Sequence, residues 1–220
     1  MTYTAPRAIF DLDGTLVDSA PSLCAAGNAL LAELGRDPVD VPTYKSFVGK
    51  GMKVQVERLL THSGGIPDGD IDRFFARFRA HYDPLKATRA YPGAVAALTA
   101  MHAAGWRCSV CTQKPEGPAR MVLSALGFSM IEMVIGGDTI PGALKPDPRM
   151  LAAAANPMGT GPAVFVGDSE TDAETAAAGG LPFLLHLPGY RHGPPEAMSP
   201  AASFDDFANL PGLAAAAIGR

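Results

Sequence analysis

Short apolar stretches alternate with helical stretches along much of this 220-residue chain. Most of the apolar stretches are bounded by Gly, Pro or Asp, which is typical of buried strands. They span residues 7–12, 106–112, 130–135, 162–167 and 181–187. The helical stretches between several of them span residues 92–104, 115–126, 146–155 and 171–178. This alternation predicts an α/β fold, in which helices cover both faces of a parallel, Rossmann-like sheet.

A long helical segment interrupts the pattern after the first predicted strand. We expect a first helix that is capped by Ser19 and ended by Gly35, and further apolar positions at helical spacing follow at residues 54–60 and 71–82. A helical domain that joins the core by two chain crossings can open and close over a site. We therefore expect an α/β core of residues 1–20 and 89–220 with an inserted α-helical cap domain of residues 21–88.

The composition limits the partners of the chain. Hydrophobic residues make up 47% of it, and 22 acidic residues against 18 basic ones give a net charge of -4. There is no excess of positive charge of the kind that attracts nucleic acid or anionic membranes. The N-terminal residues carry no export signal, and the longest charge-free run, residues 150–167, is broken by Gly and Pro. We expect a cytoplasmic protein that binds neither nucleic acid nor membrane.

The three cysteines are too few and too unevenly spaced to form a disulfide framework. Cys108 and Cys111 form a C-x-x-C pattern, but they lie in a predicted strand. A separation of three residues in a strand places the two side chains on opposite faces of the sheet. We therefore interpret both as small core thiols, in preference to a redox or zinc pair.

Polar clusters follow four of the predicted elements, at the edge where an open parallel sheet binds its ligands. Taken singly, each has an ordinary explanation as a turn, a helix cap or a solvated charge. Together they place several carboxylates, a hydroxyl and an ammonium group around one edge, which capping does not explain. The clusters are Asp11-Leu12-Asp13-Gly14-Thr15, Thr112-Gln113-Lys114, Leu144-Lys145-Pro146-Asp147 and Gly167-Asp168-Ser169-Glu170-Thr171-Asp172.

Oxygen donors dominate these clusters. They contain neither His nor Cys. Two carboxylates held close together are costly unless a cation or a proton lies between them. An all-oxygen donor set selects Mg²⁺ over zinc or copper. The clusters therefore predict a Mg²⁺ site.

The same clusters resemble the four motifs of the haloacid dehalogenase superfamily, and the resemblance spans nearly the whole chain. Its D-x-D-G-T signature corresponds to residues 11–15, its second motif to Thr112, its third to Lys145 and its fourth to residues 167–172. Residues 47–51, 56–60 and 189–190 resemble the phosphoglycolate phosphatase branch. One departure is Gln113, which stands where such phosphatases commonly carry Asn.

The resemblance implies phosphoryl transfer first to the enzyme and then to water. Asp11 would be the nucleophile, and Asp13 the general acid and base. The implied ligands of Mg²⁺ are the Asp11 carboxylate, the Asp13 main-chain carbonyl and Asp168. The implied phosphate-binding residues are Thr112, Gln113 and Lys145, and the implied supporting residues are Gly14, Thr15, Ser169 and Asp172.

Within the predicted cap, the segment Gly49-Lys50-Gly51 is a candidate substrate loop. Glycines allow the backbone to approach a ligand closely, and Lys50 could pair with a substrate carboxylate. A solvent-facing turn is the alternative interpretation of this segment.

The leading hypothesis is a Mg²⁺-dependent phosphatase for small phosphorylated metabolites, and phosphoglycolate is the first candidate substrate. One rival is a mutase of the β-phosphoglucomutase type, which would return the phosphoryl group to a sugar. Another is a non-catalytic module that binds a phosphorylated metabolite. Dehalogenation is disfavoured, because that chemistry occurs in this family without the second aspartate of the signature, whereas Asp13 is present here.

Overall fold

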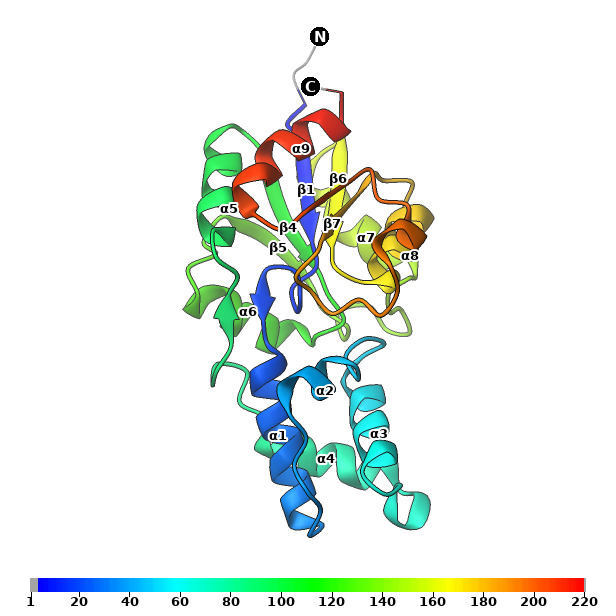
Figure 1. Ribbon diagram of the computed structural model, residues 1–220. Helices are drawn as coiled ribbons and strands as arrows, with labels where there is room; N and C mark the ends of the chain where they lie inside the picture. The colour runs from blue at the N-terminus through cyan, green and yellow to red at the C-terminus, as the bar shows by residue number, and fades with distance from the viewer. Residues whose placement is uncertain (1–3, 220) are drawn as a thin grey trace. The chain divides into compact units, whose positions relative to one another are not determined.

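The computed structural model describes residues 4–219 and contains a six-stranded sheet in the order β5-β4-β1-β6-β7-β8 (Figure 1). Each pair of neighbouring strands in this sheet is parallel. The strands are β1 (Arg7–Phe10), β4 (Arg107–Cys111), β5 (Ile131–Ile135), β6 (Ala163–Gly167), β7 (Phe183–His186) and β8 (Ala202–Phe204). The chain passes from β1 to one side of the sheet and returns to the other side at β6, so β1 lies at the topological switch point.

The chain divides into two compact units. The first comprises residues 1–18 and 89–220, and the second comprises residues 19–88. A short antiparallel ribbon of β2 (Val17–Asp18) and β3 (Arg89–Ala90) lies where the first unit is interrupted. The cap function that the sequence suggests for the second unit remains a prediction.

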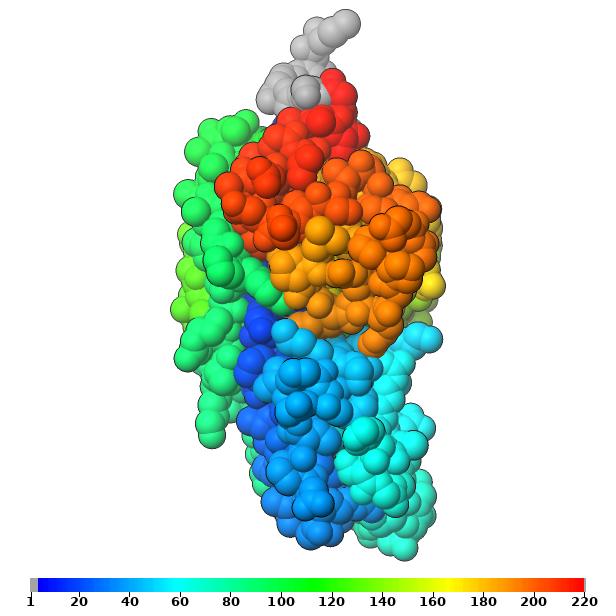
Figure 2. Space-filling view, viewed as in Figure 1, coloured from blue at the N-terminus to red at the C-terminus, as the bar shows by residue number. Residues whose placement is uncertain are grey.

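The helices of the first unit cover both faces of the sheet. They are α5 (Ala94–Ala103), α6 (Glu116–Ala125), α7 (Pro148–Ala155), α8 (Glu170–Ala178) and α9 (Leu210–Ala217), with 3-10 helices at Asn156–Met158, Pro195–Met198 and Phe207–Asn209. Side chains of α5, α6 and α9 pack on one face, and those of α7 and α8 pack on the other. Figure 2 shows the surface of α9 beside that of α5.

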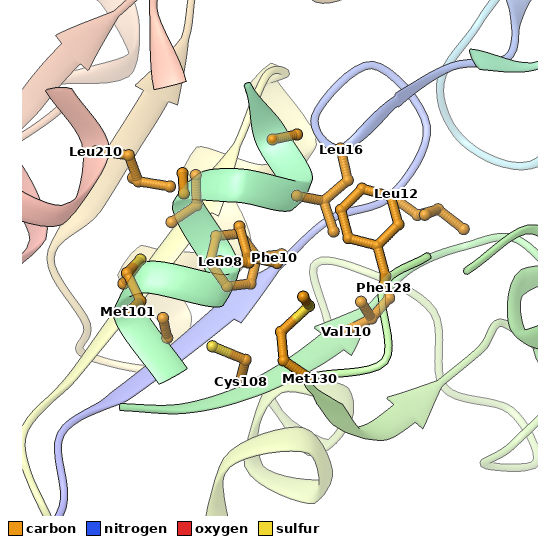
Figure 3. Packing of buried hydrophobic residues seen from close by; sticks show 14 of the residues in the cluster. Phe10, Leu12, Leu16, Leu98, Met101, Cys108, Val110, Phe128, Met130 and Leu210 are labelled. Atoms are coloured by element: carbon orange, nitrogen blue, oxygen red, sulfur yellow. The ribbon is translucent and has the colours of Figure 1, made fainter. Parts of the chain in front are cut away.

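Alternating side chains of the central strands fill the two cores. On β1, Phe10 belongs to the cluster under α5, α6 and α9, whereas Ile9 belongs to the cluster under α7 and α8. Figure 3 shows the first cluster, where Phe10 lies beside Leu98. Cys108 and Cys111 lie in different clusters, as their spacing predicts, and burial raises the pKa of each thiol to about 12. Both cysteines are therefore core side chains on opposite faces of the sheet.

The second unit is helical. It contains α1 (Ala20–Glu33), α2 (Val41–Lys45), α3 (Met52–His62), α4 (Ile71–His81) and a 3-10 helix at Pro67–Gly69. Its largest fully buried side chains include Tyr44, Phe74 and Phe78. Phe74 and Phe78, which lie four residues apart on α4, are therefore core residues, whereas the intervening Phe75 is only partly buried.

The predicted α/β class and parallel sheet are confirmed, but some details differ. The prediction missed β8, α2 and the two-residue strands β2 and β3, because such short elements have little periodicity. Ser19 holds the N-cap position of α1, yet its side chain makes no capping hydrogen bond. The Ser19 backbone is helical there, at φ −98° and ψ −7°, whereas a capping side chain needs an extended backbone.

In the part of the chain that the structure describes, no helix combines the length and the apolar character needed to cross a membrane.

His186 ends β7 and is a buried polar residue of the core unit. Its Nδ1 lies 2.9 Å from the main-chain oxygen of Gly14, so the Nδ1–H tautomer donates to that carbonyl. The imidazole also packs against the rings of Tyr91, Phe204 and Phe207. Burial lowers the pKa of His186 to about 4, so the ring is neutral in the folded protein at neutral pH.

We expect His186 to make stability depend on pH. Its pKa is lower in the folded chain than in the unfolded chain. Its contribution to the free energy of unfolding is therefore fully present above the pKa of the unfolded chain, and it is lost as pH falls toward the pKa of the folded chain. The difference in free energy of unfolding between wild type and His186→Gln should shrink by about 2 kcal/mol from pH 7 to pH 5. Urea titrations at both pH values measure it, and a pH-independent difference would contradict the prediction.

Candidate active site

Side chains from four loops meet at the carboxyl ends of the central strands. Asp11 follows β1, Thr112 follows the neighbouring strand β4, and Asp168 follows β6 on the other side of β1. Lys145 reaches the same place from the loop between β5 and α7. The structure therefore brings together residues from all four clusters that the sequence singled out.

Asp11 lies at the centre of this arrangement. Its main-chain N–H donates to the Val166 carbonyl at 2.8 Å, which extends the pairing of β1 with β6 by one residue. The Asp11 side chain is buried, and its Oδ1 lies 2.8 Å from the Nζ of Lys145. Burial raises the pKa of Asp11 to about 7, and the Lys145 ammonium opposes that rise.

Lys145 joins two of the carboxylates. Its Nζ contacts Asp11 Oδ1 and also donates to Asp172 Oδ1 at 2.6 Å. Burial alone would lower the pKa of this lysine, but the charges of Asp11 and Asp172 outweigh that effect and raise it. Lys145 is therefore a permanent cation inside the site.

Asp168 is fully enclosed by two loops. Its Oδ1 accepts from the Thr15 hydroxyl at 2.7 Å, and its Oδ2 accepts from the Tyr190 main-chain N–H at 2.7 Å. A Cβ atom at Gly14 would lie 2.3 Å from Asp168 Oδ2, and one at Gly189 would lie 2.2 Å from Asp168 Cβ. Glycine is required at both positions because the backbone passes so close to this side chain.

Ser169 and Asp172 form a capping box at the start of α8. The Ser169 side chain accepts from the Asp172 main-chain N–H, and Asp172 Oδ2 accepts from the main-chain N–H of Ser169. The ordinary explanation as a helix cap thus holds for this pair. Asp172 nevertheless has a second contact, because its other oxygen binds Lys145.

The donor set fits a hard divalent cation. Carboxylate oxygens of Asp11, Asp168 and Asp172 lie within 4.8 Å of one another, and all three residues are buried. Among the described residues, the ion pairs of these three carboxylates are those with Lys145, which leaves an excess of negative charge. Burial and the neighbouring carboxylates also raise the pKa of Asp168 well above its usual range. Asp11 Oδ1 is buried and lies against the Lys145 ammonium.

Thr112 and Gln113 follow β4. The Thr112 Oγ1 accepts from the Lys114 main-chain N–H at 3.2 Å, which leaves its own O–H free to donate to a bound anion. The Gln113 side-chain amide instead donates to the Lys145 main-chain carbonyl at 3.2 Å. Gln113 therefore braces the loop that carries Lys145, and a direct contact between Gln113 and phosphate remains a prediction.

Asp13 does not belong to the group of three carboxylates whose oxygens lie within 4.8 Å of one another. Both of its carboxylate oxygens contact Lys114 Nζ, at 3.0 and 3.2 Å. The Lys114 side chain is 1% exposed, and the Asp13 side chain is 18% exposed. Asp13 thus retains some access to solvent, and it has a cation of its own.

Sequence reasoning missed two contacts in this site. Lys114 belongs to the second cluster, but the sequence pattern indicates no role for it beyond its position two residues after Thr112. The main-chain N–H of Tyr190 on Asp168 has no signature in side-chain chemistry; the neighbouring Gly189 was the only signal available.

The candidate substrate loop belongs to the second unit. Gly49, Lys50 and Gly51 all have positive φ angles, of 115°, 56° and 87°. Gly51 is the N-cap residue of α3, and Lys50 is exposed. The loop is therefore a tight turn with an exposed cation, and its contact with substrate remains a prediction.

Comparison with known proteins gives consistent results. A family model described as haloacid dehalogenase-like hydrolase matches residues 7–180. The chain is 42% identical over 214 residues to a phosphoglycolate phosphatase of Cereibacter sphaeroides, covering 94% of this chain and 97% of the relative. It is 38% identical to one of Pseudomonas putida, covering 98% of this chain and 83% of the relative.

A solved structure shows the same fold over nearly the whole chain. It is a predicted phosphoglycolate phosphatase of Haemophilus somnus, with a TM-score of 0.86 and 27% identity over 96% of this chain and 98% of that one.

The family expected from the four motifs is thus confirmed, and so is the expectation of an enzyme. This chain belongs to the haloacid dehalogenase-like hydrolase family.

Proposed function

We propose that this protein is a Mg²⁺-dependent phosphatase that hydrolyses small phosphate monoesters, phosphoglycolate foremost, through an aspartyl-phosphate on Asp11. The observation that carries the proposal is the buried Asp11 carboxylate, whose Oδ1 lies 2.8 Å from the Lys145 ammonium and which is crowded by two further buried acids. Such an oxygen is desolvated, which suits a nucleophile or a metal ligand.

The transferred phosphoryl group would lie against Asp11, Thr112 and Lys145. The Thr112 hydroxyl has a proton to donate, and the Lys145 ammonium offsets charge on both the nucleophile and the phosphoryl oxygens. Asp13 would donate a proton to the departing oxygen and later accept one from the attacking water. Its partial exposure suits both steps, because it must reach the leaving group and then a water molecule.

Mg²⁺ would be held by the carboxylates of Asp11 and Asp168 and by the main-chain carbonyl of Asp13. When bound, it supplies positive charge that neutralises the transferring phosphoryl oxygens. Asp172 would support the site through Lys145 and Ser169, since its oxygens already bind these residues. Thr15 and the glycine at position 14 hold Asp168 in place.

The substrate class is taken from the relatives. Curated relatives named phosphoglycolate phosphatase cover nearly the full length of the chain, which supports a small acidic monoester as substrate. We extend the proposal to the second unit as a cap over the substrate, with Lys50 pairing with its carboxylate. A cytoplasmic location stays a prediction.

Phosphate release from a panel of monoesters tests the proposed function. With Mg²⁺ we expect the highest kcat/KM for phosphoglycolate, and lower values for sugar phosphates and nucleotides. Conversion of a sugar 1-phosphate to the 6-phosphate without release of inorganic phosphate would instead support a mutase. Tight binding of these compounds without any product would support a non-catalytic module.

Replacing Asp11 by Asn should reduce turnover by about 10⁴-fold or more, because the nucleophile is lost. Steady-state phosphate release measures the effect. The matched control is Asp72→Asn, at an exposed aspartate of α4 that pairs with Lys53, which should keep full activity. Substantial activity in Asp11→Asn would rule out the covalent route.

Mg²⁺ should stabilise the folded protein, because it relieves repulsion among the buried carboxylates. At about 100 times its Kd it should raise the Tm by about 5–10 °C relative to EDTA. Differential scanning calorimetry measures this shift, which should be largely lost in Asp168→Asn. An equal shift in Asp168→Asn and wild type would show that the ion binds elsewhere.

A further inference from the structure

Lys114 makes a contact that the proposed function does not yet use. Its Nζ lies 3.0 and 3.2 Å from the two carboxylate oxygens of Asp13, and its side chain is 1% exposed. Both residues belong to the core unit. A lysine side chain normally keeps its ammonium group in water, so its burial against the Asp13 carboxylate needs an explanation.

The backbone of Lys114 is held on both sides. Its N–H donates to the Thr112 hydroxyl oxygen at 3.2 Å, and its carbonyl accepts from the Gly137 N–H at 3.0 Å. A Cβ atom at Gly136 would lie 2.8 Å from the same carbonyl oxygen, so the two loops are in close contact. The Lys114 ammonium is therefore a charge at the end of an anchored, buried side chain.

The Asp13 side chain, unlike that of Lys114, is partly exposed to solvent. Asp13 follows β1 in a loop closed by main-chain bonds, in which the Gly14 N–H donates to the Val17 carbonyl. Both of its carboxylate oxygens accept hydrogen bonds from the Lys114 ammonium. The orientation of the Asp13 carboxyl group thus depends on Lys114.

We propose that Lys114 is a positioning residue that orients the Asp13 carboxyl group for proton transfer to the leaving oxygen of the substrate. The proposal rests on the proposed function, in which Asp13 is the general acid and base. An ammonium donates to a carboxyl oxygen whether the group is ionised or neutral, so one oxygen stays bound to Lys114 while the other carries the proton.

The chemistry balances in both steps. In the first step, an Asp11 oxygen bonds to phosphorus and the bond from phosphorus to the leaving oxygen breaks. The leaving oxygen keeps the electron pair and takes the proton from Asp13. In the second step, a water oxygen bonds to phosphorus, the water gives a proton to Asp13, and the bond from Asp11 to phosphorus breaks. Lys114 keeps its protons throughout.

A different role for Lys114 would be to bind an acidic group of the substrate. The two roles predict different substrate dependence. A positioning role matters where the leaving group needs a proton, whatever its charge. A binding role matters only where the substrate has an additional anionic group.

Kinetics of Lys114→Met with three substrates separates these roles. The substrates are phosphoglycolate, a phosphate monoester whose alkyl group carries no charge, and p-nitrophenyl phosphate. The phenolate of the last departs without a proton. The parameter is kcat/KM, because it reports the steps up to departure of the leaving group. We expect a loss of about 10²-fold for both alkyl esters. For the aryl ester we expect a loss below about 3-fold, since no proton transfer is needed there.

A double-mutant cycle with Asp13→Asn identifies the residue through which Lys114 acts. Asp13→Asn should itself lose far more activity on alkyl esters than on the aryl ester. Adding Lys114→Met to Asp13→Asn should then cause no further loss on alkyl esters, because the group to be oriented is gone. The matched control is Arg107→Met, at an exposed cation that starts the same strand β4 and pairs with Glu132. It should leave all three kcat/KM values unchanged.

Each outcome decides a separate question. An equal loss on all three substrates, a loss on phosphoglycolate alone, or additivity with Asp13→Asn would overturn the role of Lys114. If Asp13→Asn itself shows no preference for the aryl ester, the acid role of Asp13 in the proposed function fails instead. Lys114→Gln provides a second variant if Lys114→Met does not fold, as judged by its circular dichroism.

Discussion

The crowding of buried carboxylates at the end of β1 is the constraint on which the rest of this site depends. Asp11, Asp168 and Asp172 lie close together, and Lys145 is the cation that contacts two of them. Burial of unpaired charge is costly, so an arrangement with this excess of negative charge needs a further cation or a proton. The fold thus maintains an electrostatic imbalance where a phosphoryl group and Mg²⁺ are proposed to bind.

The sheet topology explains how residues so distant in sequence reach one place. Parallel strands β4 and β6 flank β1, so the loops after all three strands leave the same edge of the sheet. The first loop holds Asp11 and Asp13, and close packing against Gly14 and Gly189 fixes Asp168. The paired strands and the tightly packed loops that follow them hold the acidic groups in place. Such fixed charges suit a site that stabilises its transition state by preorganised electrostatics.

The sequence predicted the fold class and the clustered residues well, because both depend on local patterns. Alternating apolar stretches predicted the parallel sheet, and strand ends predicted where Asp11, Thr112 and Asp168 would meet. Contacts that depend on side-chain direction were not predictable. Nothing in the spacing shows that Gln113 reaches the Lys145 carbonyl, that Lys114 turns to Asp13, or that Ser19 lacks the extended backbone of a capping residue.

The central claim is that Asp11 carries the phosphoryl group between the substrate and water. The stereochemical course at phosphorus tests it most directly, by use of a thiophosphate monoester made chiral with sulfur and one oxygen isotope and hydrolysed in water that carries a further oxygen isotope. Two successive in-line displacements, first by Asp11 and then by water, predict overall retention of configuration. Inversion would mean that water attacks the substrate in a single displacement, which would contradict the covalent role of Asp11.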